Sequence, residues 1–145
     1  MLVEELTQRE SIVNTWNHLS DAYQPPLSTR LEDFESYVER IAQNGTTFVC
    51  KEGGYLAGGI AVYANDTASK TAFVTQLATM PGFRRKGIGT VLIARACDYS
   101  KAKGMTSIKL EVRKNNKRAM AFYKSKDFIF DGDNGDTVYL VRSLV

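Results

Sequence analysis

The order of apolar patterns along the chain predicts a single α/β domain, with one central sheet and helices on both of its faces. Segments with helical spacing of apolar residues occupy the first third of the chain and recur after residue 87, and strand-like segments lie between and after them. Three consecutive strand-like segments in the middle are separated only by short turns. No repeat, low-complexity tract or linker divides the 145 residues, so one domain spanning 1–145 is expected.

The N-terminal third is expected to hold one strand and two helices. Their bounds in chain order are a strand at 2–6, a helix at 8–23, and a helix from Ser28 or Thr29 to residue 44. Pro25 and Pro26 separate the two helices, because proline lacks a backbone donor and clashes with the preceding helical turn. Ser28 or Thr29 is expected to cap the second helix, since a side-chain hydroxyl can accept from its free N–H groups.

The rest of the chain is expected to alternate strands and helices. We expect strands at 46–51, 55–64 and 70–79, a helix at 87–103, a strand at 107–112, a helix at 116–126, and a hairpin formed by 128–130 and 137–141. The turn sequences Glu52-Gly53-Gly54 and Asp133-Asn134-Gly135 mark the two hairpins. The predicted order is therefore mixed α/β.

The segment that joins strand 70–79 to helix 87–103 has the composition of a phosphate-binding turn. Gly87 and Gly89 remove side chains that would keep an anion from the backbone, and the helix start offers free N–H groups and a positive dipole end. Arg84, Arg85 and Lys86 add positive charge. So many cationic groups beside free amides indicate a pyrophosphate rather than a single phosphate. The segment matches neither a P-loop nor a dinucleotide-binding fingerprint, so another phosphorylated cofactor is expected.

Two blocks of sequence resemble the GNAT superfamily of acyl-CoA-dependent N-acyltransferases. Arg84-x-x-Gly87-x-Gly89 is similar to the Arg/Gln-x-x-Gly-x-Gly/Ala signature of that family. The later block, from Leu110 through Asn116 and Ala119 to Tyr123, is similar to its Leu-x-Val-x-x-x-Asn-x-x-Ala-x-x-x-Tyr pattern. The resemblance covers about residues 46–142, and the N-terminal third only by its layout. It implies acetyl-CoA as the acyl donor and a mostly antiparallel mixed sheet with a splayed central parallel strand pair.

The resemblance also implies roles for individual residues. The residues expected to bind the cofactor are Leu77, Ala78, Thr79, Arg84, Arg85, Lys86, Gly87, Ile88, Gly89, Thr90, Asn116, Ala119 and Tyr123. Backbone N–H groups near Leu77 or Ala78 would face the thioester carbonyl, where negative charge develops. Tyr123 would protonate the departing thiolate as a general acid. Asn116 is equally well read as the N-cap of its helix, and both roles can coexist.

The general base is the less defined part of the site, because strand 70–79 carries no Asp or Glu and Gln76 cannot accept the proton directly. Glu111 lies twelve residues before Tyr123, a separation shared with N-terminal protein acetyltransferases of the bacterial ribosomal type, which implies a base acting through water. A structural carboxylate on a strand is the other interpretation, and both stay open. The chain departs from the family at Asp127, where glycine is usual, and we expect this to alter the exit of the preceding helix.

These observations predict acetyl transfer from acetyl-CoA to a primary amine by direct attack in a ternary complex. A small amine or amino sugar is the first acceptor considered, a protein N-terminus or lysine the second, and a catalytically silent acyl-CoA-binding module is the alternative of another class. The acceptor pocket is expected to draw on residues 16–34, the turn near Asn65 and the final hairpin. The aromatic side chains expected to line it are Tyr23, Phe34, Tyr63 and Tyr139.

Composition argues against several kinds of partner and cofactor. Nineteen Lys and Arg against sixteen Asp and Glu give a net charge of +3, which is too mild to indicate a nucleic-acid partner. Cys50, Cys97 and a single His18 fit no metal-ligand spacing, so no metal is expected, and the two cysteines fit a reducing cytoplasm. No segment approaches the roughly 20 apolar residues of a membrane span, so no membrane association is expected. A homodimer is left open.

Overall fold

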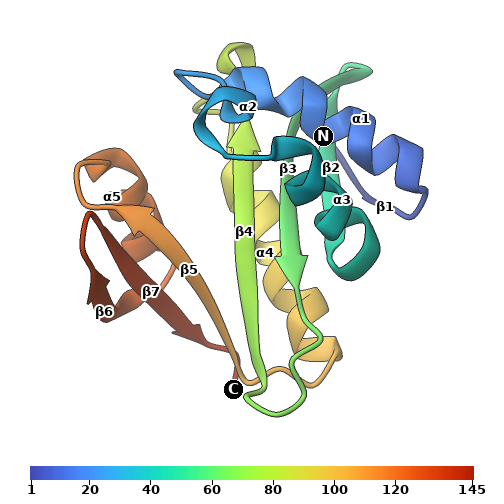
Figure 1. Ribbon diagram of the computed structural model, residues 1–145. Helices are drawn as coiled ribbons and strands as arrows, with labels where there is room; N and C mark the ends of the chain where they lie inside the picture. The colour runs from blue at the N-terminus through green and yellow to red at the C-terminus, as the bar shows by residue number, and fades with distance from the viewer.

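Seven strands form one sheet in the computed structural model, which describes residues 1–145 (Figure 1). The strands lie in the order β1-β2-β3-β4-β5-β7-β6. Their bounds are β1 Leu2–Leu6, β2 Thr46–Glu52, β3 Tyr55–Tyr63, β4 Thr71–Thr79, β5 Ser107–Arg113, β6 Ile129–Asn134 and β7 Thr137–Ser143. Every pair of neighbours is antiparallel except β4 and β5, which run parallel. The expected mixed and mostly antiparallel sheet is confirmed.

Helices cover both faces of this sheet, as expected. They are α1 Arg9–Leu19, α2 Leu27–Arg30, α3 Phe34–Asn44, α4 Ile88–Ala102 and α5 Lys117–Ser125, with 3₁₀ turns η1 Ser20–Ala22 and η2 Pro81–Phe83. Figure 1 shows α4 behind the sheet and α1 and α3 in front of it. None of these helices combines the length and the apolarity needed to cross a bilayer.

Each face of the sheet has its own apolar core. Ile88, Leu92 and Ile93 of α4 join the larger core, which also contains buried residues of five strands and receives Met120 of α5 at its border. Trp16 of α1 anchors the smaller core, where α1 and α3 pack on the other face. Its indole N–H donates to the Thr47 hydroxyl at 3.1 Å, so even this buried polar atom has a partner. The sheet between the two cores is the rigid frame that carries the site.

The second predicted helix is wrong at its start. The chain forms the short α2, becomes extended at Leu31, and begins α3 only at Phe34. Asp33 is the N-cap of α3, and its carboxylate accepts from the Ser36 N–H at 3.2 Å. The two residues expected to cap the helix have other partners: the Ser28 N–H donates to the Ser20 hydroxyl and the Thr29 hydroxyl to the Pro26 carbonyl. An aspartate three residues before a serine was the available sequence signal for the true start.

Candidate active site

Strands β4 and β5 separate halfway along their length. Their parallel register ends at the pair Val74–Leu110. Beyond this pair β4 continues beside β3 as far as Thr79, while β5 continues beside β7 as far as Arg113. The two strands therefore form the V that Figure 1 shows at the centre of the molecule. The splayed parallel pair that we expected is confirmed, and one edge of β4 is left without a strand partner beyond the split.

A β-bulge in β4 lies directly beyond the split. Val74 and Gln76 pair with consecutive residues of β3, so Thr75 between them is the extra residue. The bulge reverses which face each following side chain points to. Val74 is buried in the core under α4, whereas Ala78, an even number of residues later, is buried against α1 and α3. Leu77 instead packs against the α4 core. The bulge thus reorients β4 where the strand loses its neighbour.

Two tyrosine hydroxyl groups from the N-terminal segment contact β4 where it leaves β5. The Tyr37 hydroxyl lies 3.2 Å from the Thr75 carbonyl oxygen and also contacts the Thr75 hydroxyl. The Tyr23 hydroxyl donates to Gln76 Oε1 at 2.6 Å, and the Leu77 carbonyl oxygen lies 3.1 Å away. Burial raises the pKa of both tyrosines, and nearby Tyr123 raises that of Tyr23 further. Both hydroxyls therefore stay protonated at neutral pH.

The turn between β4 and α4 presents free backbone donors. Gly87 is the N-cap of α4 with φ of 78°, a left-handed conformation that glycine adopts without strain. The first N–H of this helix to bond back is that of Val91, which donates to the Gly87 carbonyl oxygen at 3.1 Å. The N–H groups of residues 88–90 have no partner within the helix, and they lie at the positive end of its dipole. This arrangement suits an anion such as a pyrophosphate.

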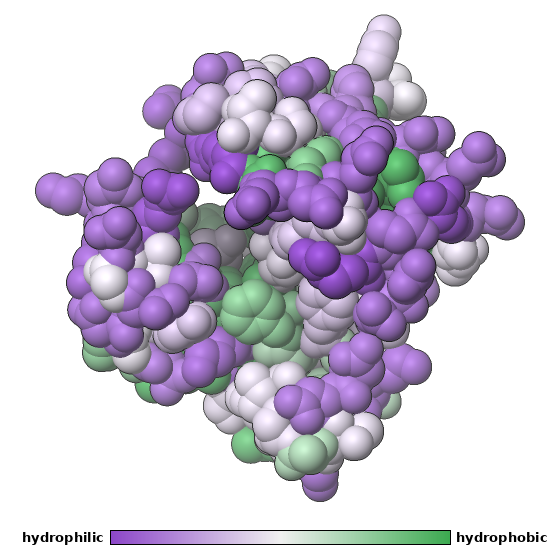
Figure 2. All heavy atoms as spheres, viewed as in Figure 1, coloured by the Kyte–Doolittle hydropathy of each residue, from purple (hydrophilic) through white to green (hydrophobic).

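A cavity of about 580 Å³ opens beside this turn, and Figure 2 shows the surface hollowed between the lobe of α5 and the rest of the molecule. Twelve of the thirteen residues predicted to bind the cofactor line it: Leu77, Ala78, Thr79, Arg84, Arg85, Gly87, Ile88, Gly89, Thr90, Asn116, Ala119 and Tyr123. The exception is Lys86, whose ammonium group lies 5.6 Å from the centre of the Phe83 ring. Lys86 thus packs on the turn and does not line the cavity, and its contact with the cofactor stays a prediction.

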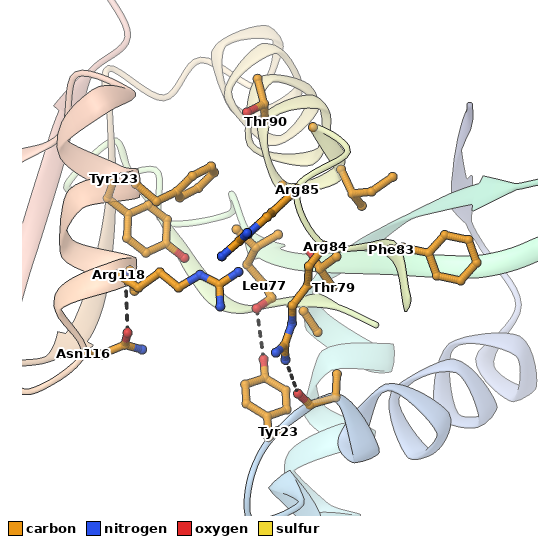
Figure 3. Close-up of a pocket in the computed structure, with 17 residues that line it drawn as sticks. Tyr23, Leu77, Thr79, Phe83, Arg84, Arg85, Thr90, Asn116, Arg118 and Tyr123 are labelled. Carbon is orange, nitrogen blue, oxygen red and sulfur yellow. Dashed lines mark hydrogen bonds between the residues drawn. The ribbon is translucent and has the colours of Figure 1, made fainter. Parts of the chain in front are cut away.

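The arginines around this cavity divide into two groups. Arg84 points toward η1, where its guanidinium donates to the Ala22 carbonyl oxygen at 2.9 Å (Figure 3). Arg85 and Arg118 instead point into the cavity in Figure 3. Arg118 was not predicted, although its place in the first turn of α5, two residues after Asn116, was a signal for it. The cavity wall also contains three residues that were not predicted: Ala22, Phe83 and Phe122.

Gly89 has a packing role as well as a place in the cavity wall. A Cβ atom built on it would lie 3.1 Å from the end of the Phe122 ring, which is tighter than an ordinary contact. The absence of a side chain at Gly89 therefore allows α5 to approach the start of α4. At the start of α5, Asn116 is the N-cap and accepts from the Ala119 N–H at 3.1 Å. The capping interpretation of Asn116 is thus confirmed, while its contact with a cofactor stays a prediction.

Tyr123 is held by aromatic packing beneath its hydroxyl group. Its ring lies edge to face with Phe122 and Phe128, at centroid distances of 5.2 and 5.6 Å. Burial raises the pKa of Tyr123 to about 12. In Figure 3 its hydroxyl points toward Leu77 across the cavity. Tyr123 is therefore a neutral hydrogen-bond donor throughout the physiological pH range, which its predicted role as an acid requires.

A second cavity of about 450 Å³ lies within the V and adjoins the first. Five residues line both cavities: Tyr23, Leu77, Asn116, Ala119 and Tyr123. The second cavity continues between β4 and β5 to α2 and α3, through Tyr37, Thr75 and Gln76 on one side and Glu111 on the other. Two molecules bound in these cavities would meet at Tyr123.

The aromatic residues predicted for an acceptor pocket are found in the second cavity only in part. Tyr23 lines it, but Phe34, Tyr63 and Tyr139 do not. Phe34 and Tyr63 pack against the smaller core instead, and the Tyr139 ring lies beneath the Lys109 ammonium at 4.6 Å. The turn near Asn65 also lies outside the cavity wall, and the final hairpin contributes Thr137.

Glu111 lies on the side of β5 that faces the second cavity. Its Oε2 accepts from Asn134 Nδ2 at 2.9 Å and from the Thr137 hydroxyl, both on the β6–β7 hairpin. Its Oε1 has no hydrogen-bond partner within the protein. The carboxylate is thus both anchored to a neighbouring element and available to the cavity, which is compatible with the structural interpretation and with the catalytic one.

A split parallel strand pair, a helix start with free N–H donors and two joined cavities make up the candidate site. Residues 11–128 match the model of the acetyltransferase (GNAT) family, and the chain therefore belongs to that family.

Similar proteins agree with this assignment. An uncharacterised N-acetyltransferase of Methanocaldococcus jannaschii is 35% identical over 85 residues, which cover 56% of this chain and 38% of that protein. L-2,4-diaminobutyric acid acetyltransferase of Nocardia farcinica is 30% identical over 79 residues, 54% of this chain and 41% of that protein. The chain thus spans less than half of either relative. The solved structure of the PaiA N-acetyltransferase from Thermoplasma acidophilum, in complex with coenzyme A, has the same fold, with a TM-score of 0.77, 17% identity and 99% of each chain covered.

Proposed function

We propose that this chain transfers an acetyl group from acetyl-CoA to a primary amine, with both substrates bound at once. The observation that carries the proposal is the junction of the two cavities at Tyr123, Leu77 and Ala119. The first cavity has the donors that a pyrophosphate needs, and the second has the size of a small-molecule site. Holding two reactants together in one orientation can contribute on the order of 7 kcal/mol or more toward the barrier.

The residues of the first cavity fit acetyl-CoA. The free N–H groups at the start of α4 and the guanidinium groups of Arg85 and Arg118 would hold its phosphates, because charge-assisted hydrogen bonds to phosphate are strong. The edge of β4 beyond the split offers backbone groups to the amides of its pantetheine arm. Bound there, acetyl-CoA supplies an activated thioester, whose C–S bond breaks as the amine nitrogen bonds to the acetyl carbon.

Two residues would move the protons of this reaction. Tyr123 would donate its hydroxyl proton to the sulfur of the leaving thiolate. Glu111 would receive the proton that the ammonium group must lose, through a water molecule, because its Oε1 is available in the second cavity. No three or more His, Cys, Asp or Glu side chains are arranged so that they could hold a metal ion. The direct mechanism proposed here uses none of the cysteines and no metal.

A small-molecule acceptor is favoured over a protein. The second cavity is bounded on several sides by α2, β4, β5 and the β6–β7 hairpin, which suits a small amine better than an extended peptide. The relative from Nocardia farcinica, named for an acetyltransferase of a diamino acid, supports the same choice.

The proposal is tested by incubating the protein with acetyl-CoA and panels of amines, polyamines, amino sugars, amino acids and peptides. Released thiol is measured together with the mass of the acetylated product. We expect N-acetylated product and CoA in equal amounts, and initial rates that require both substrates to bind before either product leaves. If CoA raises the melting temperature but no panel member is acetylated, the chain is an acyl-CoA-binding module and the proposal is wrong.

A further inference from the structure

The second cavity has an uneven charge that bears on its ligand. Its charged side chains are Arg30, Glu111 and Arg113, and the other residues that line it are neutral. The formal sum is therefore +1, since two positive charges accompany one negative charge. An acceptor amine must enter this cavity although ammonium groups are positive themselves. A ligand that also carried a negative group would balance the net positive charge of the cavity wall.

Arg30 is held in place without any acidic partner. Its Nε donates to the Pro25 carbonyl oxygen at 2.8 Å, and one terminal nitrogen donates to the Gln24 carbonyl oxygen at 2.6 Å. Its guanidinium also lies 5.4 Å from the centre of the Tyr23 ring. These two hydrogen bonds leave three of the five guanidinium N–H groups free. Arg30 is thus an oriented cation whose charge is not neutralised by the protein.

Arg113 differs from the other basic residues near the end of β5. Lys109 forms a salt bridge with Asp131 at 3.0 Å, and Lys114 forms one with Asp133 at 2.7 Å. Arg113 forms no salt bridge, and its side chain has no hydrogen bond within the protein. The hairpin therefore supplies an aspartate to each neighbouring lysine but none to the arginine in the cavity wall.

The two arginines come from elements on opposite sides of the V. Arg30 is the last residue of α2, and Arg113 is the last residue of β5. Figure 1 shows these two ends on either side of the V, while Tyr123 and Leu77 lie where the two cavities join. A ligand whose amine reaches Tyr123 would direct its other end toward the arginines. Guanidinium groups match carboxylates in charge and in planar geometry.

We propose, on the basis of the function proposed above, that the acceptor is a small amine that also carries a carboxylate, and that Arg30 and Arg113 bind this carboxylate. The reacting amine lies at the junction with the first cavity, beside Tyr123. Glu111, the acidic side chain in the wall of this cavity, would face the amine end of the ligand. The acceptor class is then an amino acid or a related zwitterion. Diamines, polyamines and amino sugars without a carboxylate are poorer acceptors.

The test compares three acceptors that share one amine chain: ornithine, ornithinamide, which lacks the negative charge, and putrescine, which lacks the carboxylate altogether. We expect kcat/KM for ornithine to exceed the values for the other two by about ten-fold or more. Arg30→Gln and Arg113→Gln should each reduce this preference several-fold. The loss should come from a higher KM for ornithine, while kcat changes little. Calorimetric titration of ornithine into the CoA-bound protein should show the same loss of affinity in both variants.

A matched control removes one positive charge far from the cavities. Lys101 lies in the last turn of α4, about 20 Å along the helix from the anion-binding turn, and Lys101→Gln should keep the wild-type preference. Equal or better acetylation of ornithinamide and putrescine would overturn the inference while leaving the proposed function intact. Acetylation of peptides alone would overturn it too. If none of the amines is acetylated although CoA binds, the proposed function fails and the inference fails with it.

Discussion

Tyr123 and Phe128 are joined twice at the end of α5. The Phe128 N–H donates to the Tyr123 carbonyl oxygen at 3.1 Å, and the two rings lie edge to face with centroids 5.6 Å apart. Between them, the Asp127 N–H donates to the Lys124 carbonyl oxygen at 3.2 Å, and Asp127 has φ of 68°. This is the hydrogen-bond pattern of a Schellman motif, with its usual apolar contact. The helix exit and the candidate acid are therefore parts of one structural unit.

Asp127→Gly should stabilise the protein, because a left-handed backbone strains every residue with a Cβ atom. We expect a gain of about 0.5–1 kcal/mol in the free energy of unfolding, measured by urea denaturation. Lys124→Gly, in the helical part of α5, is the control and should lose about the same amount. A loss of stability in Asp127→Gly would show that the aspartate side chain makes a contribution larger than the strain it imposes.

Tyr23→Phe should destabilise the fold, because it removes the 2.6 Å hydrogen bond to Gln76 Oε1. We expect a loss of about 0.5–1.5 kcal/mol in the free energy of unfolding. The double variant Tyr23→Phe/Gln76→Leu should lose less than the sum of its single variants, since neither polar group is then left without its partner. Additive losses in urea denaturation would mean that this bond does not couple the N-terminal segment to β4.

Arg85→Glu should weaken CoA binding, because it places a carboxylate in the cavity where a phosphate is expected. We expect an increase in Kd of ten-fold or more, measured by calorimetry, and a smaller thermal shift on adding CoA. Lys86→Glu makes the same change in charge at a side chain that packs on the Phe83 ring but does not itself line the cavity, and its effect should be several-fold smaller. Equal effects from both variants would indicate only a general attraction between the basic turn and CoA.

The elements of this fold follow from local patterns, whereas several site contacts do not. The bounds of β1 and the capping role of Asn116 are local properties, and both agree with the structure. The split of β4 from β5 was implied by family resemblance and not by periodicity. The bulge at Thr75 left no such local signal, because apolar residues occupy both even and odd positions of β4 on either side of it.

Contacts between distant segments could not be predicted from sequence patterns. Tyr23 and Gln76 are 53 residues apart, and nothing near either one indicates the other. Arg84 was expected at the phosphates, but its bond to Ala22 is visible only once η1 is placed beside the turn. Phe34 was expected in the acceptor pocket because it is aromatic, yet an aromatic on an apolar stripe is satisfied equally well by a core.

Glu111→Gln should impair acetyl transfer most at neutral pH, if Glu111 accepts the proton of the ammonium group. Its activity should approach that of the wild type as the pH nears the pKa of the acceptor amine, because solvent then removes the proton. Thr137→Val, which removes one hydrogen bond to the same carboxylate, is the control for a structural effect. A ratio of mutant to wild-type activity that is flat across the pH range would assign Glu111 the structural role.

Tyr123→Phe provides the most direct test of the proposal that the acyl donor and the acceptor amine meet at Tyr123. Because burial raises the pKa of Tyr123 to about 12, wild-type Tyr123 stays protonated up to that pH and should impose no alkaline loss of activity between pH 7 and 10. With an amine that the wild type acetylates, the variant should lower kcat by about ten-fold to a thousand-fold. Its Kd for acetyl-CoA should change little, because only one hydroxyl group is removed. An unchanged kcat in a folded variant that binds acetyl-CoA normally would contradict a site in which donor and acceptor meet at Tyr123.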